Sequence, residues 1–449
     1  YLSKDTSSEP GRYRTARTPY WRRVMECLSE SHPCKRVVVI AGSQLGKSEI
    51  GNNWLGYVMH LVGGPFLMVH PNVEVGRKYV QQRLSKLFEP YYDDGRPNPV
   101  GQSLEAVSDD PRAANRIMFR KYQGGYFIVV GSNAPSELAS MPIRWLYCDE
   151  VDRFAATAGR EGAPLGIVRK RQGAFPNSKE FLTSTPTVQG ESVIETEFLA
   201  TDMNLWYVPC PECTQANDGV PDGFQVLQFA PTVDNPGGIH WNKDEPSSEA
   251  GYMCAHCGCV IPWRHNAWMQ ANGEWRPGGD EYWNGLAENR GITRDITAVG
   301  FQIPAFNSPW YTWTQAKNEW IQACNDPVKL QVFVNTVEAK LWDSKGTDKA
   351  SNIDLMREGR REGTFGKGNA LNRPVCPASV VLITAGVDVQ SNRIEIEVKG
   401  WGLGEESWSL DYIVIYGDTH TSPRTGAIWA ELDIALMATY THEAYGTMG

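Results

Sequence analysis

The stretch Arg36–Ser48, RVVVIAGSQLGKS, decides the fold of the first part of the chain. Arg36–Ile40 is mostly apolar and β-branched, which predicts a buried strand, and 48–60 is a plausible helix. Between them, Ala41-Gly42-Ser43-Gln44-Leu45-Gly46-Lys47-Ser48 fits the phosphate-binding loop pattern, with alanine at the first glycine. Loop amides would cradle the phosphates of ATP, Lys47 would reach the β- and γ-phosphates, and Ser48 would hold Mg²⁺.

Further apolar runs alternate with helix-like stretches such as 74–88. The runs are Pro65–His70, Tyr126–Val130, Trp145–Cys148 and Phe181–Thr183. Strands that alternate with helices are typical of parallel sheets. The sequence therefore predicts an α/β fold with a largely parallel sheet, a P-loop ATPase domain over residues 1–203.

The run at 144–148 ends in Asp149-Glu150, about a hundred residues after the loop. A carboxylate at the end of a neighbouring strand suits Asp149 as a Mg²⁺ ligand, and Glu150 suits the base that activates water. Thr183-Ser184-Thr185-Pro186 follows the next run, where hydroxyls such as that of Thr185 would sense the γ-phosphate. A Ser/Thr/Pro turn is equally common as an ordinary loop.

Five of the ten cysteines fall between Cys210 and Cys259. Two Cys-x-x-Cys knuckles about forty residues apart predict a structural, tetrahedral Zn²⁺ site, with Cys210, Cys213, Cys254 and Cys257 as ligands. Cys259 is an alternative fourth ligand, and His256 is a weaker one.

We expect residues 204–275 to form a zinc-ribbon-like insertion, since they are rich in Pro, Gly, Cys and Trp and lack regular periodicity. Residues 276–362 would return to the ATPase domain, and 363–377 would be a linker. Residues 378–449 would begin an RNase H-like nuclease domain, in which Asp388 ends the first strand and binds Mg²⁺ or Mn²⁺. Glu395 and Glu397 fit alternating exposed positions, and Glu406 and Asp411 are weaker candidates. The remaining carboxylates would lie beyond Gly449, where we expect the polypeptide to continue.

The net charge of −9 argues against a chain that coats nucleic acid with its whole surface, although it permits a local basic channel. No apolar run approaches the ~20 residues that cross a bilayer. The chain therefore reads as soluble and intracellular.

The order of these motifs resembles the large terminase subunits of phage lambda and its relatives. Gly11–Met25, with Thr18-Pro19-Tyr20, is similar to the adenine-side segment of that family, which implies that Tyr20 contacts the nucleotide. The resemblance extends to Phe333–Thr336 before Leu341-Trp342. It implies an ATP-driven DNA-packaging motor in the host bacterial cytoplasm, with catalytic residues Lys47, Asp149, Glu150 and Asp388. The implied partners are double-stranded viral DNA, a small terminase subunit, the portal of the procapsid and other copies of the chain in a ring. A metal-dependent endonuclease activity would cut concatemeric DNA.

The chain departs from that pattern at Ser43, where many terminases carry an arginine. The charge-stabilising arginine would come from elsewhere, with Arg77, Arg169 and Arg171 as candidates. Two other functions remain open: a zinc-containing nucleic-acid-dependent ATPase or helicase, and a non-hydrolysing, nucleotide-switched DNA-binding scaffold. Glu150 argues against the scaffold, because a switch needs no general base.

Overall fold

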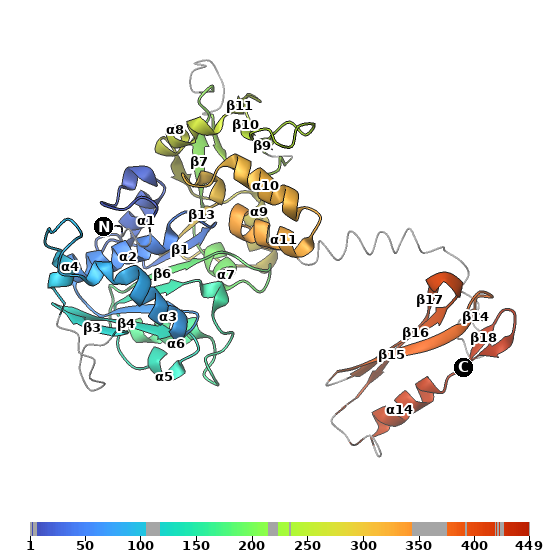
Figure 1. Ribbon diagram of the computed structural model, residues 1–449. Helices are drawn as coiled ribbons and strands as arrows, with labels where there is room; N and C mark the ends of the chain where they lie inside the picture. The colour runs from blue at the N-terminus through green and yellow to red at the C-terminus, as the bar shows by residue number, and fades with distance from the viewer. Residues whose placement is uncertain are drawn as a thin grey trace. The chain divides into compact units, whose positions relative to one another are not determined.

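The computed structural model describes residues 2, 7–104, 117–213, 223–232, 235–343, 375–390, 393–417, 419, 422 and 426–448. The chain divides into two compact units, 1–348 and 349–449 (Figure 1). Most of the expected linker, up to residue 374, lies outside the described residues. Within these ranges, no helix is long and apolar enough to cross a membrane.

One twisted sheet organises the first unit. Its described strands have the order β12-β7-β13-β1-β6-β5-β2-β4-β3, and β8 pairs with β7 at one side. All pairings from β7 through β4 are parallel, whereas β12, β8 and β3 pair antiparallel with their neighbours. The strands are β1 (Arg36–Ala41), β2 (Phe66–His70), β3 (Phe119–Tyr122), β4 (Gly125–Gly131), β5 (Trp145–Asp149), β6 (Lys179–Ser184), β7 (Asn204–Pro209), β8 (Phe224–Val226), β12 (Glu274–Arg276) and β13 (Ala298–Ile303).

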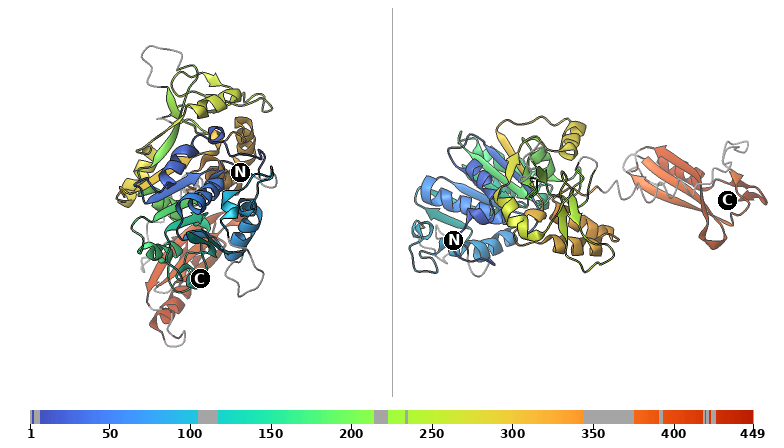
Figure 2. Two further views of the ribbon diagram at one scale, coloured as in Figure 1. Left: turned by 90° about the vertical axis from the view of Figure 1, so that its left-hand side faces the viewer. Right: turned by 90° about the horizontal axis from the view of Figure 1, so that it is seen from above.

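Helices cover both faces of this sheet (Figure 2). Alternate residues of β1 enter opposite cores: Val37 and Val39 pack with one cluster, and Val38 and Ile40 with the other. The first core includes α1 (Trp21–Leu28) and α2 (Lys47–Tyr57), and the second includes α6 (Pro164–Arg169), α7 (Val193–Leu199) and α9 (Glu281–Arg290). Burial on both faces explains why the central strands read as continuous apolar runs.

The remaining helices of the first unit are α3 (Val73–Tyr79), α4 (Pro99–Gln102), α5 (Pro135–Leu138), α8 (Asn266–Ala271), α10 (Trp313–Ala323) and α11 (Pro327–Phe333). Three π-helical turns, Val58–Val62, Val80–Leu84 and Val334–Glu338, directly continue α2, α3 and α11 among the described residues. The helix expected over 74–88 is therefore divided into α3, a π-helical turn and a 3₁₀ turn at Lys86–Phe88.

The cysteine-rich segment shares strands with the main sheet. Its small antiparallel sheet has the order β11-β10-β9, formed by Val260–Ile261, Gly251–Met253 and Gly238–His240. The expected limits of the insertion, 204 and 275, fall on β7 and β12, which pair with each other at the edge of the main sheet. The segment outside that sheet is thus shorter than the composition alone indicates.

The second unit contains the antiparallel sheet β15-β16-β17, formed by Leu382–Gln390, Arg393–Trp401 and Ser407–Tyr416. Helix α14 (Ala427–Leu436) packs through Ile428 against the side of β16 that carries Ile394, Ile396 and Val398. A second small sheet joins β14 (Val375–Cys376), β18 (Tyr440–His442) and β19 (Gly446–Met448).

The predicted α/β class with a largely parallel sheet is confirmed. Each strand expected from an apolar run is present, with ends that differ from the expected ones by at most two residues. The cause of the shifts is hydrogen bonding to neighbouring strands, which continues past the apolar residues themselves: Lys179 and Glu180, for example, pair within β6.

Candidate nucleotide site and neighbouring clusters

The loop between β1 and α2 makes a tight turn in which two residues have positive φ angles. Gly46 precedes α2 with a φ of 83°, and Gln44 also adopts a left-handed conformation, with a φ of 59°. Two side chains hold the loop from outside: Trp21 Nε1 donates to Leu45 O at 2.7 Å, and Ser308 Oγ donates to Gln44 O at 2.6 Å. The loop shape is therefore coupled to α1 and to the segment after β13.

The start of the loop is bound to protein rather than open to a ligand. Gly42 N donates to Ile303 O at 3.0 Å, and Ser43 N donates to Thr336 O at 2.7 Å. A Cβ on Gly42 would lie 2.7 Å from Ala305 N, so only glycine fits there. Because these two amides are already engaged, we expect the phosphates to be bound by amides nearer to α2.

Lys47 and Ser48 meet the acidic pair at the end of β5. Lys47 Nζ lies 2.5 Å from Glu150 Oε1, and both side chains are largely buried. Ser48 Oγ donates to Asp149 Oδ2 at 3.2 Å, and Asp149 is only 4% exposed. The structure thus brings together the four residues that two distant sequence motifs nominated.

A close packing contact aligns α2 with β5. A Cβ on Gly51 would lie 2.2 Å from the ring of Tyr147, so the helix can approach this strand only with glycine at that position. Since Gly51 lies one helical turn after Lys47, and Tyr147 lies two residues before Asp149, this contact sets the distance between the loop and the carboxylates.

Strand β6 lies between β1 and β5 and adds hydroxyl groups. Thr183 Oγ1 donates to Asp149 Oδ1 at 2.7 Å, and Thr185 Oγ1 donates to Glu150 Oε2 at 3.3 Å. Ser184 Oγ instead donates to the carbonyl of Thr185 at 2.8 Å. The direct bond from Thr183 to Asp149 is a contact that the sequence motif did not assign.

Glu150 has a φ of 57° and a ψ of 52°, the left-handed region that non-glycine residues rarely adopt. Such strain costs about 1–3 kcal/mol and is common at functional sites. Arg153, three residues later and mostly exposed, places Nε 3.6 Å from Glu150 Oε2. Arg153 was not identified from the sequence. Its position three residues after Glu150 could have suggested a contact between the two side chains.

His70 ends β2, the strand next to β5, and was also missed. Its ring packs against that of Tyr79 with centroids 4.5 Å apart, and Tyr79 donates to Ser48 O and to Asn52 Oδ1. Burial lowers the pKa of His70, opposed by the negative charges of Asp149 and Glu150. A neutral imidazole therefore borders the site.

Tyr20 lies directly before the first residue of α1. It is fully buried and packs edge-on against Trp21 and Trp206, while its carbonyl accepts a hydrogen bond from Trp275 Nε1. Its link to the phosphate loop runs through the neighbouring Trp21.

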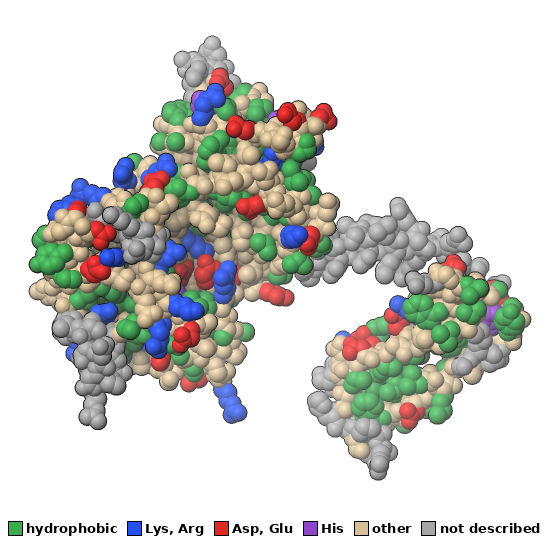
Figure 3. All heavy atoms as spheres, viewed as in Figure 1, with side chains coloured by type: hydrophobic (Ala, Val, Ile, Leu, Met, Phe, Trp, Pro, Cys, Tyr) green, Lys and Arg blue, Asp and Glu red, His purple; other side chains and the backbone are tan. Residues whose placement is uncertain are grey.

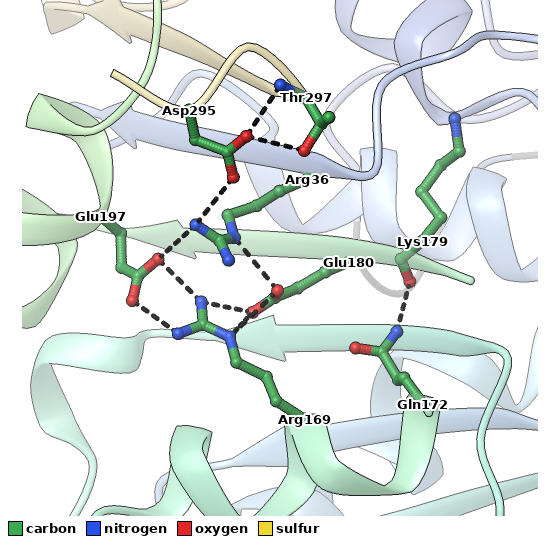
Figure 4. Close-up of polar contacts among 8 residues, drawn as sticks. All are labelled: Arg36, Arg169, Gln172, Lys179, Glu180, Glu197, Asp295 and Thr297. Atoms are coloured by element: carbon green, nitrogen blue, oxygen red, sulfur yellow. Dashed lines mark hydrogen bonds and ion pairs between the residues drawn. The ribbon is translucent and has the colours of Figure 1, made fainter. Parts of the chain in front are cut away.

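The three candidate arginines lie in different places. Arg169 is bound to Glu180 and Glu197 in an ion network at the start of β6, the end of the strand away from the acidic pair (Figure 4). Arg171 follows α6 near that same end, where its carbonyl accepts from Ile143 N. Arg77 lies exposed on α3, which follows the site end of β2.

The four cysteines of the two knuckles converge. The sulfur atoms of Cys210, Cys213, Cys254 and Cys257 all lie within 4.8 Å of one another. The Cys213–Cys254 and Cys210–Cys257 sulfur pairs are 3.8 and 3.9 Å apart. Thiolates at ~2.3 Å from a tetrahedral Zn²⁺ would be ~3.8 Å apart, so the residues fit such an ion.

Either Cys257 or Cys259 could be the fourth ligand of such a zinc ion. Cys259 Sγ lies 3.6 Å from Cys210 Sγ and 3.2 Å from Cys257 Sγ. His256 Nε2, by contrast, is hydrogen-bonded to the carbonyl of Phe224 at 2.9 Å.

In the second unit, Asp388 pairs in register with Glu395 on the face of the sheet away from α14. Glu397 lies on this same face, and Glu395 also contacts Arg393 at 2.5 Å. Asp411 pairs with Val398, and is therefore on the opposite face.

The surface of this unit shows a broad hydrophobic area over the sheet (Figure 3). The exposed apolar side chains of the sheet include Leu382, Tyr412 and Tyr416 on the face that carries Asp388, and Val387 and Val389 on the opposite face. Glu406, the other weak carboxylate candidate, is exposed just before β17.

Two family models match this chain. The model described as "Phage terminase large subunit gpA, ATPase domain" covers residues 7–275, and "Terminase large subunit gpA, endonuclease domain" covers 298–449. The large terminase subunit of Enterobacteria phage P21 is 27% identical over 460 residues, and that of Escherichia phage lambda is 26% identical over 449 residues. Each match covers 98% of this chain and 64% of the relative, so the chain spans less than two thirds of either protein.

Among solved structures, the large terminase ATPase domain of Thermus phage P74-26 matches with 12% identity and a TM-score of 0.35. The match covers 71% of this chain and 93% of that chain.

Proposed function

This chain belongs to the family of phage terminase large subunits, gpA, and on that basis we propose that it hydrolyses Mg·ATP to drive viral DNA into procapsids. The ATPase domain would comprise 1–203 and 276–362 in a P-loop fold, with a zinc-ribbon-like insertion within 204–275 that shares β7, β8 and β12 with the main sheet. After a linker at 363–377, residues 378–449 would begin a metal-dependent, RNase H-like endonuclease domain that cuts concatemeric DNA.

One observation carries the ATPase proposal: Lys47 and Ser48 of the loop contact Glu150 and Asp149 across the sheet. Mg²⁺, when bound, would be held by Ser48 and Asp149 and would neutralise charge on the phosphate oxygens. Thr183 orients Asp149 by donating to the oxygen that Ser48 does not use.

The ion pair between Lys47 and Glu150 has to break before ATP can be hydrolysed. Lys47 exchanges Glu150 for the β- and γ-phosphates of ATP, because phosphate carries more charge than one carboxylate. The released Glu150 carboxylate then accepts a proton from the attacking water. Thr185, which donates to Glu150 at 3.3 Å, follows the position of that carboxylate and so couples hydrolysis to movement.

The cysteine cluster would hold a structural Zn²⁺, with Cys210, Cys213 and Cys254 joined by Cys257 or Cys259. The distances between the sulfur atoms support this set. The ion would stabilise a segment whose own sheet is small and would present a surface to DNA or to a partner.

In the nuclease domain, Asp388 would be the first ligand for Mg²⁺ or Mn²⁺. The position of Glu395 opposite Asp388 supports a shared carboxylate face. The proposed partners are double-stranded viral DNA, a small terminase subunit, the portal protein and further copies of the chain in a ring, all in the host bacterial cytoplasm.

The decisive test is the ATPase rate with and without double-stranded DNA and procapsids, comparing wild type with Glu150→Gln. We expect DNA-stimulated turnover in the wild type, and a fall of at least about a hundredfold in the variant with ATP binding retained. Glu161→Gln, an exposed residue nearby in sequence, is the matched control and keeps wild-type turnover.

Each alternative function gives a different result. Binding of ATP without turnover in the wild type would favour the nucleotide-switched scaffold. Strand separation by the wild type on a partial duplex, with no procapsid stimulation, would favour a helicase.

A further inference from the structure

A second cluster of sulfur and nitrogen atoms lies at the other end of the sheet, before β1. The side chains of Cys27, His32 and Cys34 bring their potential ligand atoms within 4.8 Å of one another. Cys27, the last but one residue of α1, has a buried side chain, and Cys34 is only 5% exposed. The proposed ATPase and nuclease activities use none of these residues.

A buried lysine completes the cluster. Lys179, at the start of β6, is 3% exposed and donates to Cys27 O at 2.7 Å and to His32 O at 3.0 Å. Its Nζ also lies 3.9 Å from Cys34 Sγ. Among the described residues, no carboxylate forms an ion pair with Lys179, so the nearest group able to balance its charge is a thiolate.

The surroundings of the two thiols shift their pKa values in opposite directions. A hydrogen bond from Cys27, together with the charge of Lys179, lowers the pKa of Cys34 to about 6 against the effect of burial. The hydrogen bond to Cys34 and burial raise the pKa of Cys27. One thiolate beside one thiol is the combination in which the first sulfur reacts with an oxidant and the second resolves the product.

The hydrogen bonds of His32 disfavour a metal ion here. Cys34 N donates to His32 Nδ1 at 3.3 Å, which leaves the ring proton on Nε2. That atom faces Cys27 Sγ at 3.9 Å, so the nitrogen nearest the sulfur is a donor and lacks a free lone pair. The ammonium group of Lys179 further opposes a cation.

We propose that Cys27 and Cys34 form a reversible oxidation site, in which peroxide converts the two thiols into an intramolecular disulfide. The Cys34 thiolate attacks hydrogen peroxide, giving the sulfenic acid and hydroxide. The Cys27 thiol then attacks the Cys34 sulfur, forming the S–S bond, and its proton leaves with the hydroxyl group as water. Added thiol reverses the bond by exchange.

The disulfide would tie the end of α1 to Cys34, two residues before β1. Because Trp21 of the same helix holds the phosphate loop at Leu45, the bond restrains a helix that contacts the nucleotide site. The oxidation is nevertheless independent of ATP turnover, and its test does not require an active enzyme.

The test treats the full chain with hydrogen peroxide at neutral pH, blocks remaining thiols and digests with trypsin. Both cysteines fall in one tryptic peptide, Val24–Lys35. We expect this peptide to lose two hydrogen masses and to recover them after reduction. Cys324→Ser, which removes a partly exposed thiol elsewhere, keeps the result and serves as the control.

Variants separate the two roles. Cys27→Ser should trap a sulfenic acid on Cys34 that a dimedone probe captures, and Cys34→Ser should leave Cys27 unmodified. Lys179→Met should slow oxidation by about tenfold or more, because it removes the charge that favours the thiolate. Circular dichroism establishes that each variant is folded.

Two results would overturn the proposal. One is independent modification of both cysteines with no peptide that has lost two hydrogens. The other is the loss of one zinc equivalent per chain in the Cys27→Ser, Cys34→Ser double variant, which would show a metal site instead.

Discussion

Replacement of Arg169 by methionine tests whether this arginine supports the fold or the chemistry. Its guanidinium donates to Glu180 at 2.9 and 3.1 Å and to Glu197 at 2.7 and 2.8 Å, and these carboxylates are 6% and 14% exposed (Figure 4). Removing one partner of a buried pair costs ~3–5 kcal/mol. Arg36 remains within 3.2 Å of Glu180 and 3.4 Å of Glu197, and Arg169 is itself 28% exposed, so we expect a cost below that range, of about 2–3 kcal/mol.

The assay is urea unfolding followed by tryptophan fluorescence, paired with ATP turnover under conditions in which the protein is folded. Arg169→Met should lower the free energy of unfolding and leave turnover near the wild-type rate. Lys170→Met removes an exposed charge from the next residue and should change neither. Unchanged stability together with a loss of turnover would refute the structural role and return Arg169 to the candidates for charge stabilisation.

Three further predictions follow from the same structure. Lys47→Ala should reduce ATP turnover by at least about a hundredfold, because it removes the cation that would contact the β- and γ-phosphates; wild-type turnover would refute the loop assignment. Cys210→Ser should lose one zinc equivalent per chain, as measured by elemental analysis. Of Cys257→Ser and Cys259→Ser, only the variant that lacks the fourth ligand should lose zinc as well. Full zinc content in Cys210→Ser would exclude the zinc site. Burial raises the pKa of the Glu195 carboxyl above its ordinary 4.5. The folded state therefore binds this proton more tightly than the unfolded state does. The free energy of unfolding should fall as the pH rises from 4.5 through the folded pKa. Glu195→Gln should remove that decrease, and an identical pH slope in both proteins, measured by urea unfolding, would contradict it.

The candidate nucleotide site was the most predictable part of the chain, because its motifs are local. A β-branched strand, a glycine turn and a helix start lie within Arg36–Ser48, and Asp149 closes a strand in the same parallel sheet. Since the carboxyl ends of parallel strands meet at one edge, the convergence of Ser48 and Asp149 followed from the predicted fold. The hydrogen bond from Thr183 to Asp149 depends on β6 lying between β1 and β5. No single stretch of the sequence predicts that order of strands.

Other features depend on contacts between distant segments. Composition marked 204–275 as a separate module, yet β7 and β12 pair with the main sheet through residues that look no different from their neighbours. The register that places Glu395 opposite Asp388 is set by backbone pairing, which alternation alone leaves undefined. The left-handed backbone of Glu150 is a tertiary constraint, since glutamate has no local preference for it.

The position of β13 beside β1 has a consequence for biosynthesis. One edge of β1 is completed by β6, but the other has to wait for Ala298–Ile303, about 260 residues later in the chain. At roughly 5–20 residues per second, the nascent polypeptide carries a mostly apolar central strand with this edge unpaired for about 13 to 50 s of translation. During that interval the incomplete sheet exposes an unpaired edge, which can aggregate or bind host chaperones. The expression yield should therefore depend strongly on translation speed and on the supply of chaperones. The free energy of unfolding of the finished protein alone would not predict this dependence.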